Sequence, residues 1–366
     1  MKILLSALTG LGNFVLKTPM VQAWKELYPD DDIHLIAGNT YGAEFVLRGS
    51  PLITRTHFIS VKATWYEKFR FFRQLRHEHF DVVVLPFDAQ PNFLIFGSYL
   101  ARIPLRIRHL PPALLSDKRK AAITLLCAKN TRWVPVLAGR HETELNMDLL
   151  RAYHQKPIAT KFPSIVNFVR NPEVLQRFGL QSKPYILLQP GAANGQYMAK
   201  VWPPFRFAAL IQQLAAHFPQ YAIVLAGDSG DYQKNIDPLL KLLPEPIRSL
   251  VKNTAGETNI HELVNLIDHA ALLICHDSGI MHLADALNKP LIALFGPTDY
   301  TRTRPLKPNS TVLFAQGEYD NAMYNFARSE ADLEKMDIGH RAMESLSVEE
   351  VMNEVKNKLG IDLRGA

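Results

Sequence analysis

The stretch from residue 270 to residue 299 constrains the fold of this chain most strongly. Leu272 to Cys275 is a short apolar run typical of buried parallel strands, and it leads into the small polar turn Asp277-Ser278-Gly279. A helical pattern then runs to Pro290, and Leu291 to Phe295 predicts another strand. The sequence therefore predicts a strand-turn-helix-strand unit whose turn lies at the carboxyl end of a strand, where open α/β sheets bind ligands.

The polar turn has two interpretations. Ser278 and Gly279 can present backbone N–H groups at a helix N-terminus, and the helix dipole attracts an anion such as phosphate to that position. Alternatively, Asp277 or Ser278 only caps the helix, which is a common role for both residue types. The turn by itself leaves both interpretations open.

The rest of the chain repeats the same rhythm. In the first half, Lys2 to Ala7 predicts a strand, Thr9-Gly10-Leu11-Gly12-Asn13 a glycine-rich turn, and Val82 to Leu85 another buried strand. A proline-rich stretch over residues 155–184 separates this half from a second series that starts at Tyr185. Strands alternating with helices in both halves predict two α/β domains with doubly wound parallel sheets, which 366 residues can fill.

Two motifs resemble a known family. The pattern Asp277-Ser-Gly-x-Met-His-Leu-Ala-x-Ala-x-x-x-Pro290, followed by Phe-Gly-Pro-Thr, is similar to the donor-site signature of family-nine glycosyltransferases, the lipopolysaccharide heptosyltransferases. Pro190-Gly-Ala, followed by Ala199-Lys-Val-Trp-Pro203, resembles a second segment of that family. The resemblance implies the GT-B architecture, in which two Rossmann-like domains face each other across a cleft. It implies an acceptor domain at 1–170, a nucleotide-sugar domain at 171–345 and a helix at 346–366 that packs back toward the N-terminal domain.

The resemblance also implies a set of donor contacts. In the family the lysine that matches Lys200 contacts the donor diphosphate. A cation can stabilise the negative charge that builds on a departing nucleoside diphosphate, so no metal is needed there. The alternative is a solvated lysine beside a buried tryptophan. His282 faces either the ligand or the core. The choice between Asp228 and Asp231 of the Gly227–Asp231 loop stays open. The donor-binding residues implied are Gly191, Ala192, Lys200, Asp228, Asp231, Thr258, Asp277, Ser278, Gly279 and His282.

The catalytic base is the point where this chain departs from the family. Asn13 stands where the family has an aspartate that takes the proton of the acceptor hydroxyl, and an amide cannot act as that base. Asp88, which follows a predicted strand, is our candidate for the missing carboxylate. The other interpretations are that Asn13 only orients the acceptor, or that the protein is an impaired transferase.

The basic residues of the first half favour an anionic acceptor. The formal net charge is +6, and one basic run contains Lys62, Lys68, Arg70, Arg73 and Arg76 with aromatic residues between them. A second run contains Arg102, Arg106, Arg108, Lys118, Arg119 and Lys120. We assign Gly12, Asn13, Lys62 and Arg70 to acceptor binding. A solvated helix face is the alternative, and we expect no nucleic acid because no nucleic-acid motif accompanies the runs.

Composition sets the remaining expectations. Hydrophobic residues make up 47% of the chain, and no stretch is long and apolar enough to predict a transmembrane helix. We therefore expect a cytoplasmic protein, with peripheral contact at the inner membrane. Two cysteines, Cys127 and Cys275, form neither a disulfide framework nor a zinc site. We expect no metal and no cofactor beyond the nucleotide-sugar substrate.

The sequence thus predicts a metal-independent, inverting glycosyltransferase. The resemblance implies transfer of heptose from ADP-heptose to a lipopolysaccharide core or a related saccharide. Three alternatives stay open: a transferase of the same family with another nucleotide sugar, a nucleotide-sugar-binding homologue without turnover, and a different GT-B enzyme such as a sugar epimerase.

Overall fold

The computed structural model describes residues 1–38, 46–47, 49–110, 122, 128–166, 168–192, 198–316 and 338–360. Lys118, Arg119, Lys120 and Cys127, which the sequence analysis singled out, lie outside these residues. The chain divides into two compact units, Met1–Phe168 and Val169–Ala366.

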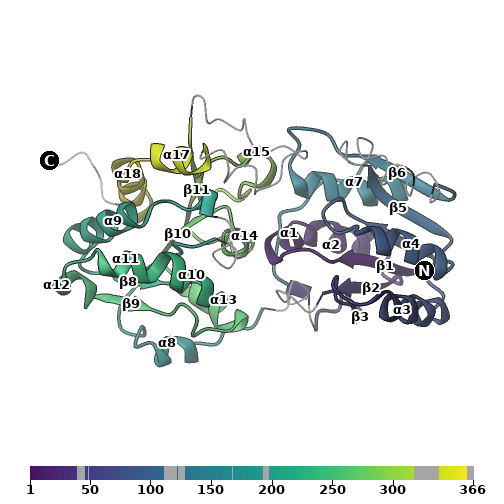
Figure 1. Cartoon of the computed structure of the whole chain (residues 1–366), viewed down its shortest axis with the longest axis horizontal. Helices are drawn as coiled ribbons and strands as arrows, with labels where there is room; N and C mark the ends of the chain where they lie inside the picture. Colours follow the sequence, from purple (N-terminus) through teal and green to yellow (C-terminus); the bar gives the residue numbers. More distant parts are fainter. Residues whose placement is uncertain are drawn as a thin grey trace. The chain divides into compact units, whose positions relative to one another are not determined.

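The first unit is built on a parallel sheet with the strand order β3-β2-β1-β4-β5-β6 (Figure 1). Strands β1, β2 and β4 are almost completely buried, as expected for strands covered on both faces. The strands are β1 (Lys2–Ala7), β2 (Asp32–Ala37), β3 (Arg55–Phe58), β4 (Val82–Leu85), β5 (Leu105–Leu110) and β6 (Thr131–Pro135).

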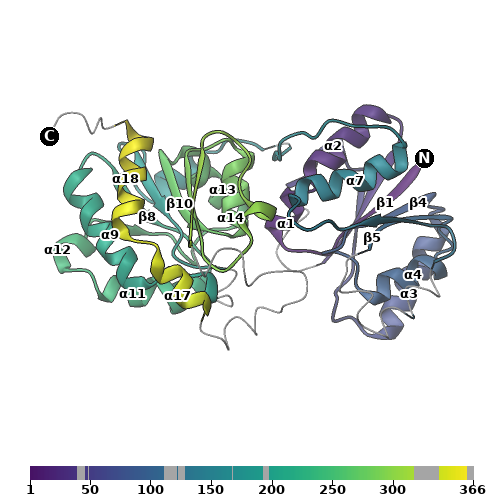
Figure 2. The ribbon, with the colours of Figure 1, turned by 90° about the horizontal axis from the view of Figure 1, so that it is seen from above.

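Helices cover both faces of the first sheet. Figure 2 shows α2 and α7 on one side and α3 and α4 on the other, and each pair is in contact. The glycine-rich turn leads into two short helices, α1 and α2, and Pro19 lies in the first turn of α2, where a missing backbone N–H costs nothing. The described helices are α1 (Leu11–Val15), α2 (Thr18–Leu27), α3 (Trp65–His77), α4 (Asn92–Leu100) and α7 (Glu142–His154).

Strand β5 corrects one interpretation of the basic residues. Arg106 and Arg108 were expected within a basic surface run, but both side chains are buried. The Arg106 guanidinium stacks on the Tyr99 ring at 3.9 Å from its centroid, and that of Arg108 lies over the Trp133 ring at 4.7 Å. Aromatic faces and hydrogen bonds replace water around these two cations, so they can sit inside a strand.

The second unit repeats the topology of the first. Its parallel sheet has the order β12-β11-β10-β7-β8-β9, so that in both sheets the first strand lies at the centre and the chain grows outward in two directions. This is the strand order of a Rossmann fold. The strands are β7 (Tyr185–Leu188), β8 (Ala222–Leu225), β9 (Val251–Asn253), β10 (Leu272–His276), β11 (Leu291–Phe295) and β12 (Ser310–Phe314).

Helices also surround the second sheet, and α9 supplies much of the core. Phe207 of α9 and Trp202, which precedes the helix, are completely buried and make an edge-to-face ring contact with centroids 5.0 Å apart. The helical segments are α8 (Glu173–Arg177), η2 (Met198–Lys200), α9 (Pro204–His217), α10 (Ser229–Asp231), η3 (Tyr232–Ile236), α11 (Asp237–Lys241), α12 (Glu245–Arg248), α13 (Ile260–His269), α14 (Gly279–Ala286), α15 (Tyr300–Thr303), α17 (Ile338–Ser345) and α18 (Val348–Leu359).

The C-terminal helix α18 buries its apolar face within the second unit. Its apolar face, formed by Val348, Val351, Met352 and Val355, lies in the core of the second unit. The helix contacts α9, β10 and β11. Whether the segment 346–366 also packs toward the N-terminal domain stays a prediction.

Candidate active site

Each sheet has one switch point, which is the pair of adjacent parallel strands whose following connections run to opposite sides. In the first sheet it lies between β1 and β4, and in the second between β7 and β10. The loops after such strands diverge and leave a crevice at the carboxyl edge of the sheet, which is the usual ligand site of open α/β folds. The sequence-predicted site residues fall mostly in these four loops.

A buried ion pair occupies the first switch point. Asp88 Oδ2, in the loop after β4, accepts hydrogen bonds from Lys17 Nζ at 2.6 Å and from Thr9 Oγ1 at 2.7 Å. Lys17 Nζ also donates to the backbone carbonyl oxygen of Asn13 at 3.0 Å. The structure thus links the two predicted catalytic residues, Asn13 and Asp88, through a lysine that the sequence analysis did not identify.

The surroundings of Asp88 keep its carboxyl group ionised. Burial alone raises the pKa of Asp88, but the Lys17 ammonium and the Thr9 hydroxyl outweigh burial and hold that pKa below its usual range. Lys17 is completely buried, and among the described residues Asp88 Oδ1 has no hydrogen-bond partner. One carboxylate oxygen is therefore held by protein donors, and the other is left to accept a hydrogen bond or a proton.

Asn13 lies in α1 and is partly buried, directly after the buried Gly12. Its side-chain amide has no group that titrates near neutral pH, so it can orient a hydroxyl but cannot remove its proton. Gln90, which follows Asp88, has another function: its amide donates to the His109 carbonyl oxygen and accepts from Arg108 Nε. These bonds tie the loop after β4 to β5.

The second switch point is held together by a chain of hydrogen bonds. Ser278 Oγ, after β10, donates to Gln189 Oε1 at 3.0 Å, and Gln189 Nε2 donates to the Gly191 carbonyl oxygen at 2.5 Å. Ser278 is the N-cap residue of α14 by position, yet its side chain makes no capping hydrogen bond. The capping interpretation of Ser278 is therefore wrong, and among the described residues no side-chain capping hydrogen bond is found at the N-terminus of α14.

Lys200 and Asp277 form the charged part of this site. Lys200 Nζ lies 3.4 Å from Asp277 Oδ2, and Thr303 Oγ1 donates to Asp277 Oδ1 at 3.2 Å. Burial alone raises the pKa of Asp277, but Lys200 and then His282 outweigh it and lower that pKa below its usual range. A lysine and an open helix N-terminus next to each other form a suitable environment for a phosphate group.

His282 lies on α14 and is buried. Burial lowers its pKa, although the charges of Asp277 and Asp285 act in the opposite direction, so the ring is neutral near pH 7. Its Nδ1 has no hydrogen-bond partner among the described residues. The histidine sits beside Asp277 and Lys200 and has one ring nitrogen left over for a ligand.

His276, at the end of β10, was missed by the sequence analysis. The Trp202 backbone N–H donates to its Nε2 at 2.9 Å, and its Nδ1 lies 3.1 Å from the Gly191 carbonyl oxygen. These contacts require a neutral ring with the proton on Nδ1, and burial lowers the pKa of His276 to about 4. His276 thereby joins the Lys200 segment to the loop after β7.

The remaining predicted donor residues differ in their surroundings. Asp228 is exposed, and its Oδ1 accepts from the backbone N–H groups of Gly230 and Asp231 at the start of α10. Asp231 is buried, and a Cβ atom placed on Gly191 would lie 2.0 Å from its Oδ1, so only glycine fits there. Ala192 is buried and Thr258 partly buried. Whether any of them contacts a donor stays a prediction.

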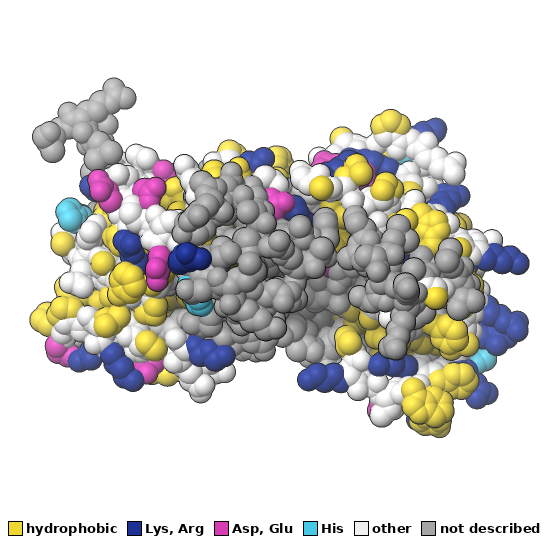
Figure 3. All heavy atoms as spheres, turned by 45° about the horizontal axis from the view of Figure 1, so that its top comes forward, with side chains coloured by type: hydrophobic (Ala, Val, Ile, Leu, Met, Phe, Trp, Pro, Cys, Tyr) yellow, Lys and Arg dark blue, Asp and Glu magenta, His cyan; other side chains and the backbone are white. Residues whose placement is uncertain are grey.

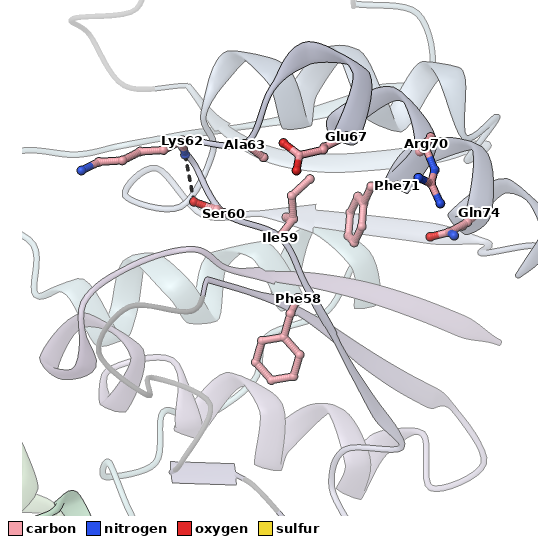
Figure 4. A pocket seen from close by; sticks show the side chains of 9 residues that line it. All are labelled: Phe58, Ile59, Ser60, Lys62, Ala63, Glu67, Arg70, Phe71 and Gln74. Carbon is pink, nitrogen blue, oxygen red and sulfur yellow. Dashed lines mark hydrogen bonds between the residues drawn. The ribbon is translucent and has the colours of Figure 1, made fainter.

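Lys62 and Arg70 line a common pocket in the first unit. The pocket has a volume of about 510 Å³ and lies between the end of β3 and α3 (Figure 4). In that view the Arg70 guanidinium lies near Gln74, and the Lys62 side chain extends away from the other residues. Glu67 accepts hydrogen bonds from Thr64, so its carboxylate is engaged in capping α3. The lining includes neither Asn13 nor Asp88, so the predicted acceptor residues form two separate groups.

The described part of the chain contains neither a metal-binding cluster nor a membrane-spanning helix. No group of three or more His, Cys, Asp or Glu side chains there has the arrangement of a metal site. No described helix is both long and apolar enough to cross a membrane.

Known proteins show clear similarity to this chain. The family model for glycosyltransferase family 9 (heptosyltransferase) matches residues 68–325. Lipooligosaccharide heptosyltransferase 2 of Haemophilus influenzae is 27% identical over 322 residues, which cover 86% of this chain and 88% of that protein. Lipopolysaccharide heptosyltransferase 2 of Escherichia coli is 38% identical over 138 residues, which cover 37% and 38% of the two chains.

Solved structures agree with the fold. The structure of ADP-heptose lipopolysaccharide heptosyltransferase II from Escherichia coli has a TM-score of 0.74 at 23% identity, and covers 98% of both chains. That of a family 9 glycosyl transferase from Veillonella parvula has a TM-score of 0.78 at 16% identity, and covers 99% of this chain and 98% of that one. The prediction of an α/β fold of the GT-B type is confirmed.

Proposed function

This chain belongs to glycosyltransferase family 9, the heptosyltransferase family, as the sequence resemblance indicated, and is a glycosyltransferase; we propose that it transfers heptose from ADP-heptose to a lipopolysaccharide core or a related saccharide acceptor. The observation that carries this proposal is the second switch point. There a lysine, an aspartate and an uncapped helix N-terminus lie together at the carboxyl edge of a Rossmann sheet.

The donor diphosphate would bind against Lys200 and the N-terminus of α14. Negative charge builds on the diphosphate as its bond to the sugar breaks, and the ammonium group and the helix N–H groups can stabilise that charge. Asp277 fixes the position of Lys200, and the leftover nitrogen of His282 can bond to a donor oxygen. This arrangement supports a reaction that needs no metal ion.

The acceptor hydroxyl would attack the anomeric carbon from the side opposite the diphosphate. In that single step the new C–O bond forms, the bond to the diphosphate breaks, and the hydroxyl proton moves to Asp88 Oδ1, which gives inversion. A carboxylate with a low pKa suffices because the hydroxyl becomes strongly acidic as its oxygen bonds to carbon. Asn13 would orient that hydroxyl, with Gly12 leaving space for it.

We assign the acceptor to residues 1–170 and the donor to residues 171–345. Lys62 and Arg70, at the pocket beside α3, would bind anionic groups of the acceptor away from the reacting hydroxyl. An anionic acceptor that is linked to lipid would bring the enzyme to the cytoplasmic face of the inner membrane. The same geometry also suits another nucleotide sugar, because the phosphate contacts do not depend on the base or the sugar.

Binding calorimetry tests this proposal. We expect ADP-heptose and ADP to bind, UDP-glucose and GDP-mannose to bind more weakly, and Asp277→Ala to abolish binding. Lys200→Met should weaken ADP binding, whereas Lys241→Met, which removes an exposed lysine of α11, should not. Equal binding of all four nucleotides would contradict the ADP-heptose assignment, and unchanged affinity in Asp277→Ala would contradict the donor site. Tight donor binding without transfer would instead support the alternative that this chain binds a nucleotide sugar without turning it over.

A further inference from the structure

Helix α3 carries an unusual outward face. At about 100° per residue, one arc of this helix collects its aromatic and cationic side chains. The opposite arc buries Phe72 and Leu75 in the core. The residues of the outward arc, which we call the α3 outer face, are Trp65, Tyr66, Phe69, Arg70, Arg73, Arg76 and His77.

The aromatic residues of the α3 outer face are far more exposed than such residues usually are. Trp65 is 79% exposed, Tyr66 56% and Phe69 46%. They occupy the first turns of the helix, whereas the arginines occupy the later turns. Large aromatic side chains gain most by leaving water, so a face that keeps three of them in water gains from a partner with an apolar layer.

The charge of this face has a single sign. No described carboxylate pairs with Arg70, Arg73 or Arg76, and the α3 outer face contains no acidic residue. Glu67 lies off the arc and accepts hydrogen bonds from Thr64. The Arg70 guanidinium lies over the Tyr66 ring, 5.9 Å from its centroid. Three arginines without a described carboxylate partner, next to exposed aromatic rings, match a partner that is negatively charged at its surface and apolar beneath it.

The neighbouring helix α4 extends the apolar part of the surface. The two helices pack closely, because a Cβ atom placed on Gly97 would lie 2.1 Å from the Phe72 ring. Two further side chains of α4 remain in solvent: Phe96 is 58% exposed and Leu100 37%. Toward the lower right of Figure 3, in the region where Figure 1 labels α3, hydrophobic side chains lie among those of lysine and arginine.

We propose that the α3 outer face, with Phe96 and Leu100 of α4, docks this protein on an anionic phospholipid bilayer. Tryptophan and tyrosine prefer the depth of the lipid headgroups, and arginines bind the lipid phosphates. The aromatic turns enter the interface and the arginine turns lie against its negative surface. The inference rests on the proposed function in one respect, since a lipid-linked acceptor gives the enzyme a reason to bind a membrane.

The test is co-sedimentation with vesicles of phosphatidylcholine and phosphatidylglycerol, compared with vesicles of phosphatidylcholine alone. The full chain should bind the anionic vesicles, and salt should weaken the binding. Each cation near an anionic surface contributes about a fivefold change in partitioning, so Arg73→Gln/Arg76→Gln should bind about 25-fold more weakly. The control Lys183→Gln/Lys252→Gln removes two exposed cations of the second unit and should bind like wild type.

A second readout follows Trp65 directly. Its fluorescence should shift to shorter wavelength on anionic vesicles, and Trp65→Phe should lose that shift while keeping most of the binding. Trp65→Ser/Phe69→Ser should lose vesicle binding with an unchanged circular dichroism spectrum, because both side chains are exposed. Equal binding to both vesicle types, equal loss in both charge variants, or capture of RNA in place of vesicles would overturn the docking surface.

The outcomes separate this surface from the proposed activity. Heptose transfer to a detergent-solubilised acceptor, without vesicle binding, would reject the docking surface and leave the activity in place. Vesicle binding that depends on Trp65 and the two arginines, without any transfer, would reject the activity and leave the surface in place.

Discussion

Replacing Lys17 by methionine is the sharpest test of the buried ion pair. The 2.6 Å contact between Lys17 Nζ and Asp88 Oδ2 corresponds to an attraction of about 6 kcal/mol at an effective dielectric constant near 20. Lys17→Met removes this attraction and leaves Asp88 buried without its counter-charge. Breaking a buried pair in this way typically costs about 3–5 kcal/mol.

Protonation of Asp88 limits that loss and makes it depend on pH. In wild type the pKa of Asp88 is lowered, so the carboxylate stabilises the fold above its unfolded pKa, and this stability is lost as the pH falls through the folded pKa. In Lys17→Met, the Thr9 hydroxyl still lowers the pKa of Asp88, but burial, which was the largest single influence, is no longer balanced by the ammonium and raises that pKa. A carboxyl group with an unfolded pKa near 3.9 can be protonated at a cost of about 4 kcal/mol at pH 7 and about 1.5 kcal/mol at pH 5.

Urea unfolding followed by circular dichroism at both pH values measures this effect. We expect Lys17→Met to lose about 3–4 kcal/mol of unfolding free energy at pH 7 and less than half of that at pH 5. Lys17→Met/Asp88→Asn should recover most of the loss, since no buried charge remains. A loss that is the same at both pH values, or a double variant no more stable than Lys17→Met, would refute the role assigned to the pair.

Two further predictions concern the second switch point and acid stability. Gly191→Ala should destabilise the protein by about 1–3 kcal/mol and weaken donor binding, because Asp231 must move. The control Gly10→Ala, which has open space around it, should do neither. Thermal unfolding measures the stability and calorimetry the donor binding, and equal effects of the two variants would contradict the steric argument. Burial lowers the pKa of His109 and of His276 to about 4, so the folded protein binds protons at these rings less readily than the unfolded chain. The free energy of unfolding should therefore fall by roughly 3 kcal/mol for each histidine as the pH drops from 6.5 to 4. Unfolding midpoints that stay constant over this range would refute the claim that both rings are buried in the neutral form.

Much of the fold could be predicted from the sequence because the central strands, such as β4, β7, β10 and β11, are short uncharged runs that are mostly apolar. The apolar strand Val82–Leu85 has the bounds expected from its pattern. Strand β5 was missed, since the arginines in Leu105–Leu110 interrupt the apolar pattern that identifies a buried strand. Only the fold supplies the aromatic rings that make those arginines compatible with the core.

The candidate site could be predicted only where its residues lie close together in the sequence. The Asp277–Gly279 turn lies within one motif, and its position at the end of a strand already indicated a ligand site. The contact between Lys17 and Asp88 joins residues 71 positions apart, and that between Trp202 and His276 joins residues 74 apart. No periodicity in the sequence contains such pairs, because they arise from the order of strands in the sheet.

A transfer assay with ADP-heptose and a lipopolysaccharide core acceptor tests the central claim most directly. Wild type should release ADP only when the acceptor is present and give an acceptor heavier by one heptose. Asp88→Asn should bind ADP-heptose normally but turn over about 10²–10⁴ times more slowly, because an amide is not basic enough to take the hydroxyl proton. Absence of a heptosylated product in wild type would contradict the proposed reaction, and full turnover in Asp88→Asn would contradict the assigned base.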